Sequence, residues 1–259
     1  MTTLVPVTVC AALLAACASA ATSDQGEAPQ RMRAEVKQEI PHDRGAFTEG
    51  LELADGRLYE GTGLAGRSTI RTVDPATGAV QQQTALPDLF GEGITVVGPT
   101  LWQLTYTEGV AIQRDRATLR ELRRVSYQGQ GWGLCHDSAA NRLVMSNGSD
   151  RLTFRDPQSF QPTGELHVTY AGRPLDQINE LECAGGAVFA NVWQTDTIVR
   201  IDLSSGRVSQ DINLEGLLPA AERAKVDVLN GIAAIPGTDE FLVTGKYWPK
   251  MFRVRFVVA

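Results

Sequence analysis

Phe47-Thr48-Glu49-Gly50-Leu51 contains the first copy of a short phrase that returns along the whole chain and decides its fold. The later copies are Glu92-Gly93-Ile94, Trp132-Gly133-Leu134, Asn179-Glu180-Leu181 and Asn230-Gly231-Ile232. Neighbouring copies are about 40 to 50 residues apart, a period typical of repeated supersecondary units. The first residue of the phrase changes from copy to copy while its surroundings stay alike. Such a varied position on a repeated frame is where a site can be built.

Each repeat carries the signals of a small antiparallel sheet. A turn such as Ala54-Asp55-Gly56 follows the phrase, and a second apolar run comes next, as in residues 58–61. Alternating stretches such as 69–74 and 197–202 then lead into turns rich in Asp, Pro and Gly, which predicts strands joined in hairpins. Units of this length are typical of propeller blades. We therefore predict an all-β, five-bladed β-propeller; the alternative is a twisted sandwich of two sheets.

The last repeat is short of one strand. It ends with the alternating stretch 252–258, which is its third strand, and the chain then has no residues left for a fourth. A spare strand pattern lies before the first phrase, at residues 34–40. We expect this N-terminal strand to complete the last blade. The propeller domain is expected to span residues 32–259.

The N-terminal segment has the features of a targeting leader. Residues 4–21 are apolar and small, and Ala18-Ser19-Ala20 has the form that signal peptidase accepts. Leu14-Ala15-Ala16-Cys17 also resembles a bacterial lipobox, although the first nine residues contain no Lys or Arg. We expect a leader over residues 1–20, a flexible tether over 21–31, and export to the periplasm or, as a lipoprotein anchored through Cys17, to the outer membrane.

Composition excludes some partners and leaves one covalent question open. The net charge of -6 argues against a nucleic-acid surface, which needs a concentrated basic face. Beyond the leader, no segment approaches the roughly 20 apolar residues of a membrane span. We expect a monomer that acts on peptides or proteins. Cys135 and Cys183 follow neighbouring copies of the phrase, so a disulfide and a pair of unpaired buried thiols both stay open.

Aligning the repeats gives two sets of equivalent positions. Equivalent positions share a height in a propeller, so both sets should meet on one face around the axis. Polar groups between aromatic walls are the usual form of a small-ligand pocket. The first strands contribute Glu49, Glu92, Trp132, Asn179 and Asn230, and the ends of the second strands contribute Gly63, Tyr106, Gly148, Trp193 and Lys246.

The motifs around these positions resemble the plant and bacterial type of glutaminyl cyclase (glutaminyl-peptide cyclotransferase). The resemblance covers about residues 38–256 and implies a five-bladed propeller that needs no cofactor. It also implies cyclisation of an N-terminal glutamine to pyroglutamate with release of ammonia. The motifs that carry it include Gly91-Glu92-Gly93-Ile94, Gly131-Trp132-Gly133-Leu134, Asn179-Glu180-Leu181-Glu182, Ala190-Asn191-Val192-Trp193, Leu229-Asn230-Gly231-Ile232 and Thr244-Gly245-Lys246-Tyr247-Trp248-Pro249.

The resemblance implies roles for five of these residues. Glu92 is expected to move the proton from the substrate amine to the leaving ammonia, as a general acid and base. Asn179 and Lys246 are expected to donate hydrogen bonds to the γ-carbonyl oxygen. Trp132 and Trp193 are expected to form walls with an indole N–H available as a further donor. The alternatives are a Glu92 that only forms ion pairs, a solvated Lys246 and indoles that only fill the core.

A second group is expected to bind substrate: Phe47, Glu49 and Tyr106. Glu49 could hold the substrate ammonium, raise the pKa of Glu92 by like-charge proximity, or simply anchor its strand. The family often has Trp where this chain has Tyr106, and Tyr where it has Ala65, which leaves the selectivity of the peptide-side subsite open. We expect Asn230 to be structural.

Metal chemistry at the reacting centre is not expected, although a structural metal ion and two rival functions stay open. His42, His136 and His167 have no ligand spacing, and catalytic zinc usually takes three protein ligands. A structural calcium ion in the central channel stays open. Glu180 and Glu182 either support the site residues from behind or line the central channel. The rival functions are a non-catalytic peptide-binding propeller and a metal-dependent lactonase or hydrolase propeller, whose metal Glu49, Glu92, Asn179 and Asn230 could hold.

Overall fold

The computed structural model describes residues 1–3 and 26–259, and its regular structure is almost entirely β-strand. The predicted cleavage site and the lipobox with Cys17 lie outside the described residues. Within the described part, no helix is long and apolar enough to cross a membrane. The all-β prediction is confirmed.

Three consecutive segments each fold into a four-stranded antiparallel sheet. Strands that are neighbours in sequence are neighbours in each sheet, because turns rich in Asp and Gly connect them. The first sheet holds β2 (Thr48–Ala54), β3 (Arg57–Thr62), β4 (Ser68–Val73) and β5 (Val80–Leu86). The second holds β6 (Gly91–Val97), β7 (Thr100–Thr105), β8 (Val110–Asp115) and β9 (Glu121–Ser126), and the third β10 (Leu134–Asp137), β11 (Arg142–Met145), β12 (Arg151–Arg155) and β13 (Pro162–His167).

The rest of the chain forms an eight-stranded sheet, a small hairpin and one short helix. The order in the large sheet is β16-β17-β18-β19-β1-β22-β21-β20. Its strands are β16 (Ile178–Ala184), β17 (Ala187–Val192), β18 (Thr197–Asp202), β19 (Val208–Asn213), β1 (Gln30–Pro41), β22 (Lys250–Val258), β21 (Glu240–Gly245) and β20 (Leu229–Ala234). The hairpin is β14 (Thr169–Tyr170) with β15 (Arg173–Pro174), and the helix is α1 (Ala220–Arg223).

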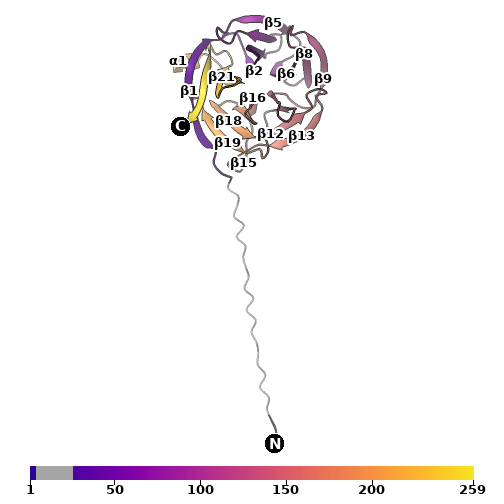
Figure 1. Ribbon diagram of the computed structural model, residues 1–259, viewed down its shortest axis with the longest axis vertical. Helices are drawn as coiled ribbons and strands as arrows, with labels where there is room; N and C mark the ends of the chain where they lie inside the picture. The colour runs from indigo at the N-terminus through magenta and orange to yellow at the C-terminus, as the bar shows by residue number, and fades with distance from the viewer. Residues whose placement is uncertain (4–25) are drawn as a thin grey trace.

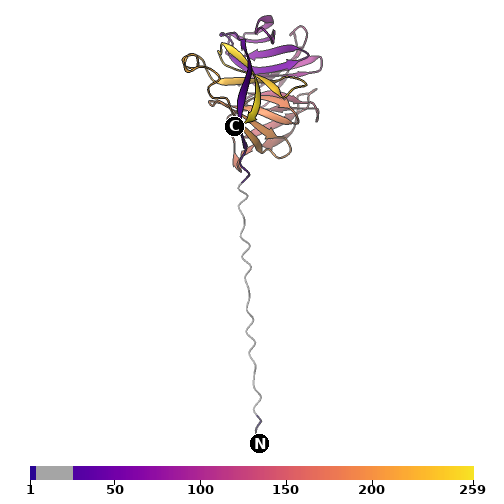
Figure 2. The same ribbon diagram turned by 60° about the vertical axis from the view of Figure 1, so that its left-hand side comes forward.

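The N-terminal strand β1 joins the two halves of this large sheet. It pairs antiparallel with β22, from Met32 opposite Val258 to Pro41 opposite Lys250. Its first residues, Gln30–Arg33, also pair in parallel with β19. The strand therefore begins before residue 34 and takes up the end of the expected tether. Both ribbon views show β1 beside the C-terminal strand (Figures 1 and 2).

The sheets are arranged around a common centre (Figure 1), with β2, β6 and β16 toward the middle and β5, β9 and β13 at the rim. The innermost strands form a closed circle of neighbours. In this circle β2 contacts β6, β6 contacts β10, β10 contacts β16, β16 contacts β20, and β20 contacts β2. This is the arrangement of a β-propeller, in which facing sheets bury the core between them.

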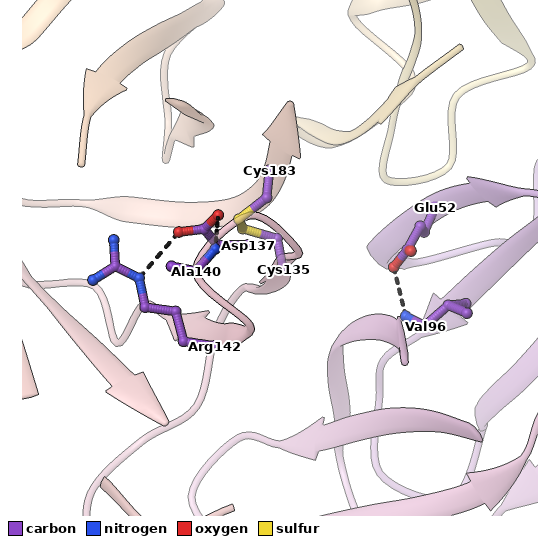
Figure 3. The surroundings of a disulfide bond; sticks show 7 residues. All are labelled: Glu52, Val96, Cys135, Asp137, Ala140, Arg142 and Cys183. Carbon is purple, nitrogen blue, oxygen red and sulfur yellow. Dashed lines mark hydrogen bonds and ion pairs between the residues drawn. A yellow bond between two sulfur atoms is a disulfide. The ribbon is translucent and has the colours of Figure 1, made fainter. Parts of the chain in front are cut away.

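The hydrophobic core lies between neighbouring sheets, and one covalent link crosses it. Leu104 of β7 and Leu143 of β11 share a buried cluster between the second and third sheets. A disulfide joins Cys135 of β10 to Cys183 of β16, with 5.4 Å between the Cα atoms. Figure 3 shows this bond beside the Asp137–Arg142 ion pair. Of the two states that the sequence left open for the cysteines, the structure has the disulfide.

Candidate functional site

The repeated phrase marks a β-bulge at the start of the innermost strands. In β2, Thr48 pairs with Thr62 and Gly50 with Gly61, so Glu49 is an extra residue without a partner. The register of β6 skips in the same way around Glu92, that of β16 around Asn179, and that of β20 around Asn230. A bulge re-aims the side chain of the extra residue. The side chain at the first position of the phrase therefore does not follow the regular alternation of side-chain directions along its strand.

The small residue that follows is required by close contact between the innermost strands. A Cβ atom on Gly93 would lie 2.6 Å from the Trp132 carbonyl oxygen, and one on Gly133 would lie 2.2 Å from that of Asn179. The fourth copy has Glu180 instead of a small residue. Its carboxylate accepts hydrogen bonds from the backbone N–H groups of Leu51 (3.2 Å) and Ile232 (2.8 Å). Glu180 therefore bridges the neighbouring inner strands β2 and β20.

A cavity of about 570 Å³ opens where these bulged residues converge. The structure brings together all eight residues expected at the catalytic and substrate-binding positions. Asn230, Gly63 and Ala65 do not line the cavity: Asn230 is buried beneath it, Gly63 packs against Glu49, and Ala65 is an exposed turn residue. The lining consists of Phe47, Glu49, Phe90, Glu92, Tyr106, Gln130, Trp132, Asn147, Gly148, Ser149, Gln177, Asn179, Trp193, Asp227 and Lys246.

Two carboxyl groups and one amine meet at one end of the cavity. The Lys246 Nζ atom donates to Glu49 Oε1 at 2.8 Å, and Asn230 Nδ2 donates to Glu49 Oε2 at 3.2 Å. Glu49 and Glu92 lie close enough that each affects the proton affinity of the other. Both residues are almost completely buried, with 1% of Glu49 and 5% of Glu92 exposed. Glu49 therefore accepts hydrogen bonds from an amine and an amide and has a second carboxyl group as its neighbour.

Burial and like charge raise the pKa of both carboxyl groups. Burial raises the pKa of Glu49 to about 7, and the Lys246 ammonium opposes this rise. Burial, followed by the negative charge of Glu49, raises the pKa of Glu92 well above its ordinary value of 4.5. Two neighbouring buried carboxyl groups share a proton more easily than they both ionise. The pair as a whole therefore holds protons more tightly than ordinary carboxyl groups do.

A network behind Glu49 fixes its strand. The Thr48 hydroxyl donates to Glu60 Oε1 at 2.7 Å, and the same oxygen lies 2.9 Å from His42 Nε2. The Arg71 guanidinium pairs with the other oxygen of Glu60. These contacts hold the pKa of the Glu60 carboxyl at about 2 despite its burial. A rigid anchor next to Glu49 limits how far this carboxylate can move.

An arc of aromatic rings forms the wall of the cavity. Each ring packs against the next, with centroids 5.3 to 6.4 Å apart. The Phe47 ring also lies 4.4 Å from the Lys246 Nζ atom, a cation–π contact that leaves this ammonium little room to move. The arc runs through Tyr247, Phe47, Phe90, Tyr106, Trp132 and Trp193.

The Trp132 indole and the Asn179 amide differ in whether their polar atoms are already bonded within the protein. The Trp132 indole N–H donates to Gln130 Oε1 at 3.0 Å, so it is occupied within the protein rather than available to a ligand. The Asn179 side chain is 3% exposed, and its Oδ1 atom has no hydrogen-bond partner within the described residues. A buried amide oxygen without a partner is costly. Asn179 is therefore prepared to bind a polar ligand in the cavity.

Comparison with known proteins identifies the chain. The family model described as glutamine cyclotransferase matches residues 8–256. The chain belongs to the glutamine cyclotransferase family. The glutaminyl-peptide cyclotransferase of Arabidopsis thaliana is 39% identical over 232 residues, which cover 87% of this chain and 72% of that protein. The crystal structure of the Myxococcus xanthus glutaminyl cyclase matches with a TM-score of 0.83 and 36% identity, covering 89% of this chain and 99% of the other.

Several lining residues of this glutamine cyclotransferase were not found from the sequence. Phe90 stands two residues before Glu92, as Phe47 stands two before Glu49, so aligning the repeats two positions further would have found it. Gln130 and Gln177 stand two residues before Trp132 and Asn179 and would have been found in the same way. Asn147 and Ser149 flank the aligned Gly148. Asp227 lies in the segment between α1 and β20, which has no counterpart in the other repeats.

Three further carboxyl groups on the inner strands, those of Glu52, Glu180 and Glu182, do not line the cavity. Glu52 accepts a hydrogen bond from the Val96 amide at 2.7 Å, and burial raises its pKa to about 7. Burial also raises the pKa of Glu180 and Glu182. Within residues 1–3 and 26–259, no group of three or more His, Cys, Asp or Glu side chains is placed to hold a metal ion. The structural calcium ion of the sequence analysis stays a prediction.

Proposed function

We propose that this chain is a glutaminyl-peptide cyclotransferase that uses Glu92 as its general acid and base. The observation that carries the proposal is the buried Glu49–Glu92 carboxyl pair beside Lys246, at one end of an aromatic cavity. The substrate supplies its own nucleophile, the α-amine of an N-terminal glutamine, which attacks the γ-carbonyl carbon. The protein has to orient the substrate, move one proton and stabilise one developing negative charge.

Glu92 is suited to moving the proton because its pKa is raised. The new C–N bond forms as the neutral amine attacks, and the Glu92 carboxylate takes the proton from that nitrogen. Glu92 then gives the proton to the γ-nitrogen, and the C–N bond to ammonia breaks. A free α-amine has a pKa of about 7.7 to 8.0, so a carboxyl group with a raised pKa is better matched to it than an ordinary one. Such catalysis typically contributes about 10²–10⁴ in rate.

Lys246 and Asn179 can stabilise the oxygen that becomes negative. An ammonium group has three donors, and the bond to Glu49 uses one of them. The Asn179 amide can donate through Nδ2 to the γ-carbonyl oxygen and accept through its unpartnered Oδ1 from the γ-NH₂ group. This pairing of two amides would favour glutamine over glutamate. Removing one such donor commonly costs about 10²–10³ in kcat.

The aromatic arc gives the glutamine side chain an apolar, water-poor surrounding. Trp132 and Trp193 meet edge to face at 5.7 Å, so the two indoles form a corner rather than a flat wall. Tyr106 continues the wall and keeps an aromatic ring at this position. Exclusion of water strengthens the electrostatic contacts of Glu92 and Lys246 with the substrate.

We further propose five blades and an exported protein. The closed circle of β2, β6, β10, β16 and β20 supports five blades, with β1 as the fourth strand of the last one. The disulfide supports an oxidising compartment, since such bonds are rare in the reducing cytosol. Mass spectrometry of the mature N-terminus would distinguish a lipidated Cys17 from a free Ala21.

A coupled assay of ammonia release from Gln-Ala tests the proposal. The wild-type protein should release ammonia, and a chelator should not change the rate. Glu92→Gln should lower kcat by at least about 10², with an unchanged circular dichroism spectrum. Glu165→Gln makes the same chemical change on the exposed outer strand β13 and should leave activity unaffected. No ammonia release by the wild type would refute the cyclotransferase, and near-normal turnover by Glu92→Gln would remove this residue from its role.

A further inference from the structure

Asp227 contributes a carboxylate to the cavity that the chemistry proposed above does not use. Its side chain lines the cavity and is exposed, in contrast to the buried Glu49 and Glu92. Within the described residues it forms no ion pair. The Glu49 carboxylate pairs with Lys246, and Glu92 is buried beside it. Asp227 is thus an exposed lining carboxylate that no described cation neutralises.

The backbone around Asp227 is held firmly in place. Its N–H donates to the Lys246 carbonyl at 3.0 Å, and its own carbonyl accepts from Trp248 Nε1 at 3.0 Å. One carboxylate oxygen accepts from the Val228 N–H at 2.7 Å, which leaves the other free. The Asp227 carboxylate therefore has a defined place on the cavity wall, next to Lys246.

The Arg223 guanidinium, which contacts the backbone of Asp227, does not neutralise the charge of the Asp227 carboxylate. Arg223 Nη1 donates to the backbone carbonyl of Asp227 at 3.0 Å, and its Nη2 lies 3.4 Å from the Asp196 carboxylate. The charge of Arg223 is thus directed to another carboxylate. The charge of Asp227 also acts on Glu49, at the buried end of the cavity. The pKa of Glu49 is raised mainly by burial, and Asp227 adds to this rise.

We propose that Asp227 selects peptide substrates with a cationic side chain directly after the N-terminal glutamine and disfavours acidic ones. This inference rests on the proposed cyclotransferase function. The glutamine side chain fills the buried end of the cavity, near Glu92 and Lys246, so the following residue lies toward the open end. Asp227 lines the cavity and is exposed, in contrast to the buried Glu49 and Glu92, and this assigns its carboxylate to the open end. Lys or Arg in the second position then meets an opposite charge, and Glu or Asp a like charge.

The expected effect is modest because the carboxylate is exposed to solvent. Exposed ion pairs are worth about 0.2 to 1 kcal/mol, which corresponds to about 1.4- to 5-fold in kcat/KM for a cationic over a neutral side chain. A like charge should cost a similar factor. The preference for Lys over Glu should therefore be about 2- to 25-fold at low salt, and should shrink as salt screens the charges.

The test measures kcat/KM for ammonia release from three C-terminally amidated dipeptides: Gln-Lys, Gln-norleucine and Gln-Glu. Norleucine keeps the length of Lys without its charge, and amidation removes the terminal carboxylate. The wild type should prefer Lys to norleucine and norleucine to Glu, more strongly at 20 mM than at 500 mM NaCl. Asp227→Asn should bring the three values together, and it keeps an oxygen for the Val228 amide. Glu215→Gln removes the same charge from the connection between β19 and α1, outside the cavity, and should keep the wild-type order.

Three results would overturn the inference. One is a wild type that treats the three peptides alike, and another is an Asp227→Asn variant with the wild-type order. The third is an equal loss for all three peptides, which would place Asp227 on the substrate α-ammonium that they share. A wild type without turnover of any of the three would instead refute the cyclotransferase function itself, so the two failures are distinguishable. Thermal melting of each variant checks that it is folded.

Discussion

Replacing Glu49 by Gln tests whether this carboxylate controls the proton affinity of Glu92. The change keeps the shape of the side chain and an oxygen for Lys246, but removes the charge that raises the pKa of Glu92. Two like charges about 4 Å apart repel by about 4 kcal/mol at an effective dielectric constant of about 20. One pKa unit corresponds to about 1.36 kcal/mol. Even if Lys246 screens most of this repulsion, the pKa of Glu92 should fall clearly in the variant.

The measurement is the ratio of kcat/KM in Glu49→Gln to that in the wild type, between pH 5 and pH 9. Because both enzymes use the same peptide, the titration of the substrate amine cancels in this ratio. The active form needs an ionised Glu92, and the charge of Glu49 opposes this ionisation only where Glu49 is itself ionised. The ratio should therefore be near one at pH 5, where Glu49 with its pKa of about 7 is protonated, and should rise several-fold as Glu49 ionises around neutral pH.

A flat ratio across this range would refute the reasoning, because Glu49 would then have no influence on the titration of Glu92. A ratio that falls below one as the pH rises would mean that Glu49 lowers the proton affinity of its neighbour. Glu52→Gln is the matched control. It removes another carboxyl group with a pKa raised by burial, but one that does not line the cavity, and its ratio should stay flat.

Three further predictions concern stability and substrate binding. Replacing Cys135 and Cys183 by Ser should lower the free energy of unfolding by about 4 kcal/mol, since the bond closes a loop of 48 residues; urea unfolding that matches the oxidised wild type would contradict this. Gly148→Ala should raise KM several-fold, because the new Cβ would lie 2.6 Å from the Trp132 ring, whereas Gly98→Ala, also at positive φ, meets nothing and should not. The melting temperature should fall from pH 5 to pH 8. Glu52 titrates at about 7 in the fold and near 4.5 when unfolded, so its neutral form stabilises the fold at low pH by on the order of 3 kcal/mol, lost as the pH rises through 7.

Periodicity explains how much of the site was visible in the sequence. A repeat places equivalent residues at equivalent heights, so alignment alone located Glu92, Trp132, Asn179 and Lys246 before any coordinate was considered. The aromatic and amide composition of these positions then pointed to a pocket. Phe90 was missed only because the alignment stopped two positions short. Asp227 could not be found in this way, because its segment interrupts the repeat.

Other features depended on contacts that no local pattern encodes. The bulges around Glu49, Glu92, Asn179 and Asn230 are visible only in the strand register. One of the indole N–H groups of Trp132 and Trp193 was expected to be available to substrate, and that of Trp132 donates to Gln130. The parallel pairing of Gln30–Arg33 with β19 is likewise absent from the strand pattern, because it depends on where the last repeat ends in space.

The sequence by itself determined the class of the fold, the repeat and the residues that meet around its axis, because hydrophobic alternation and turn residues act over short distances. Tertiary structure alone decided the charge state of the site. Glu49 and Glu92 are separated by a whole repeat, and only their burial side by side next to Lys246 raises their pKa. It also decided that Cys135 and Cys183 are bonded and that Asp227 faces the cavity, since both depend on distances between segments far apart in the chain.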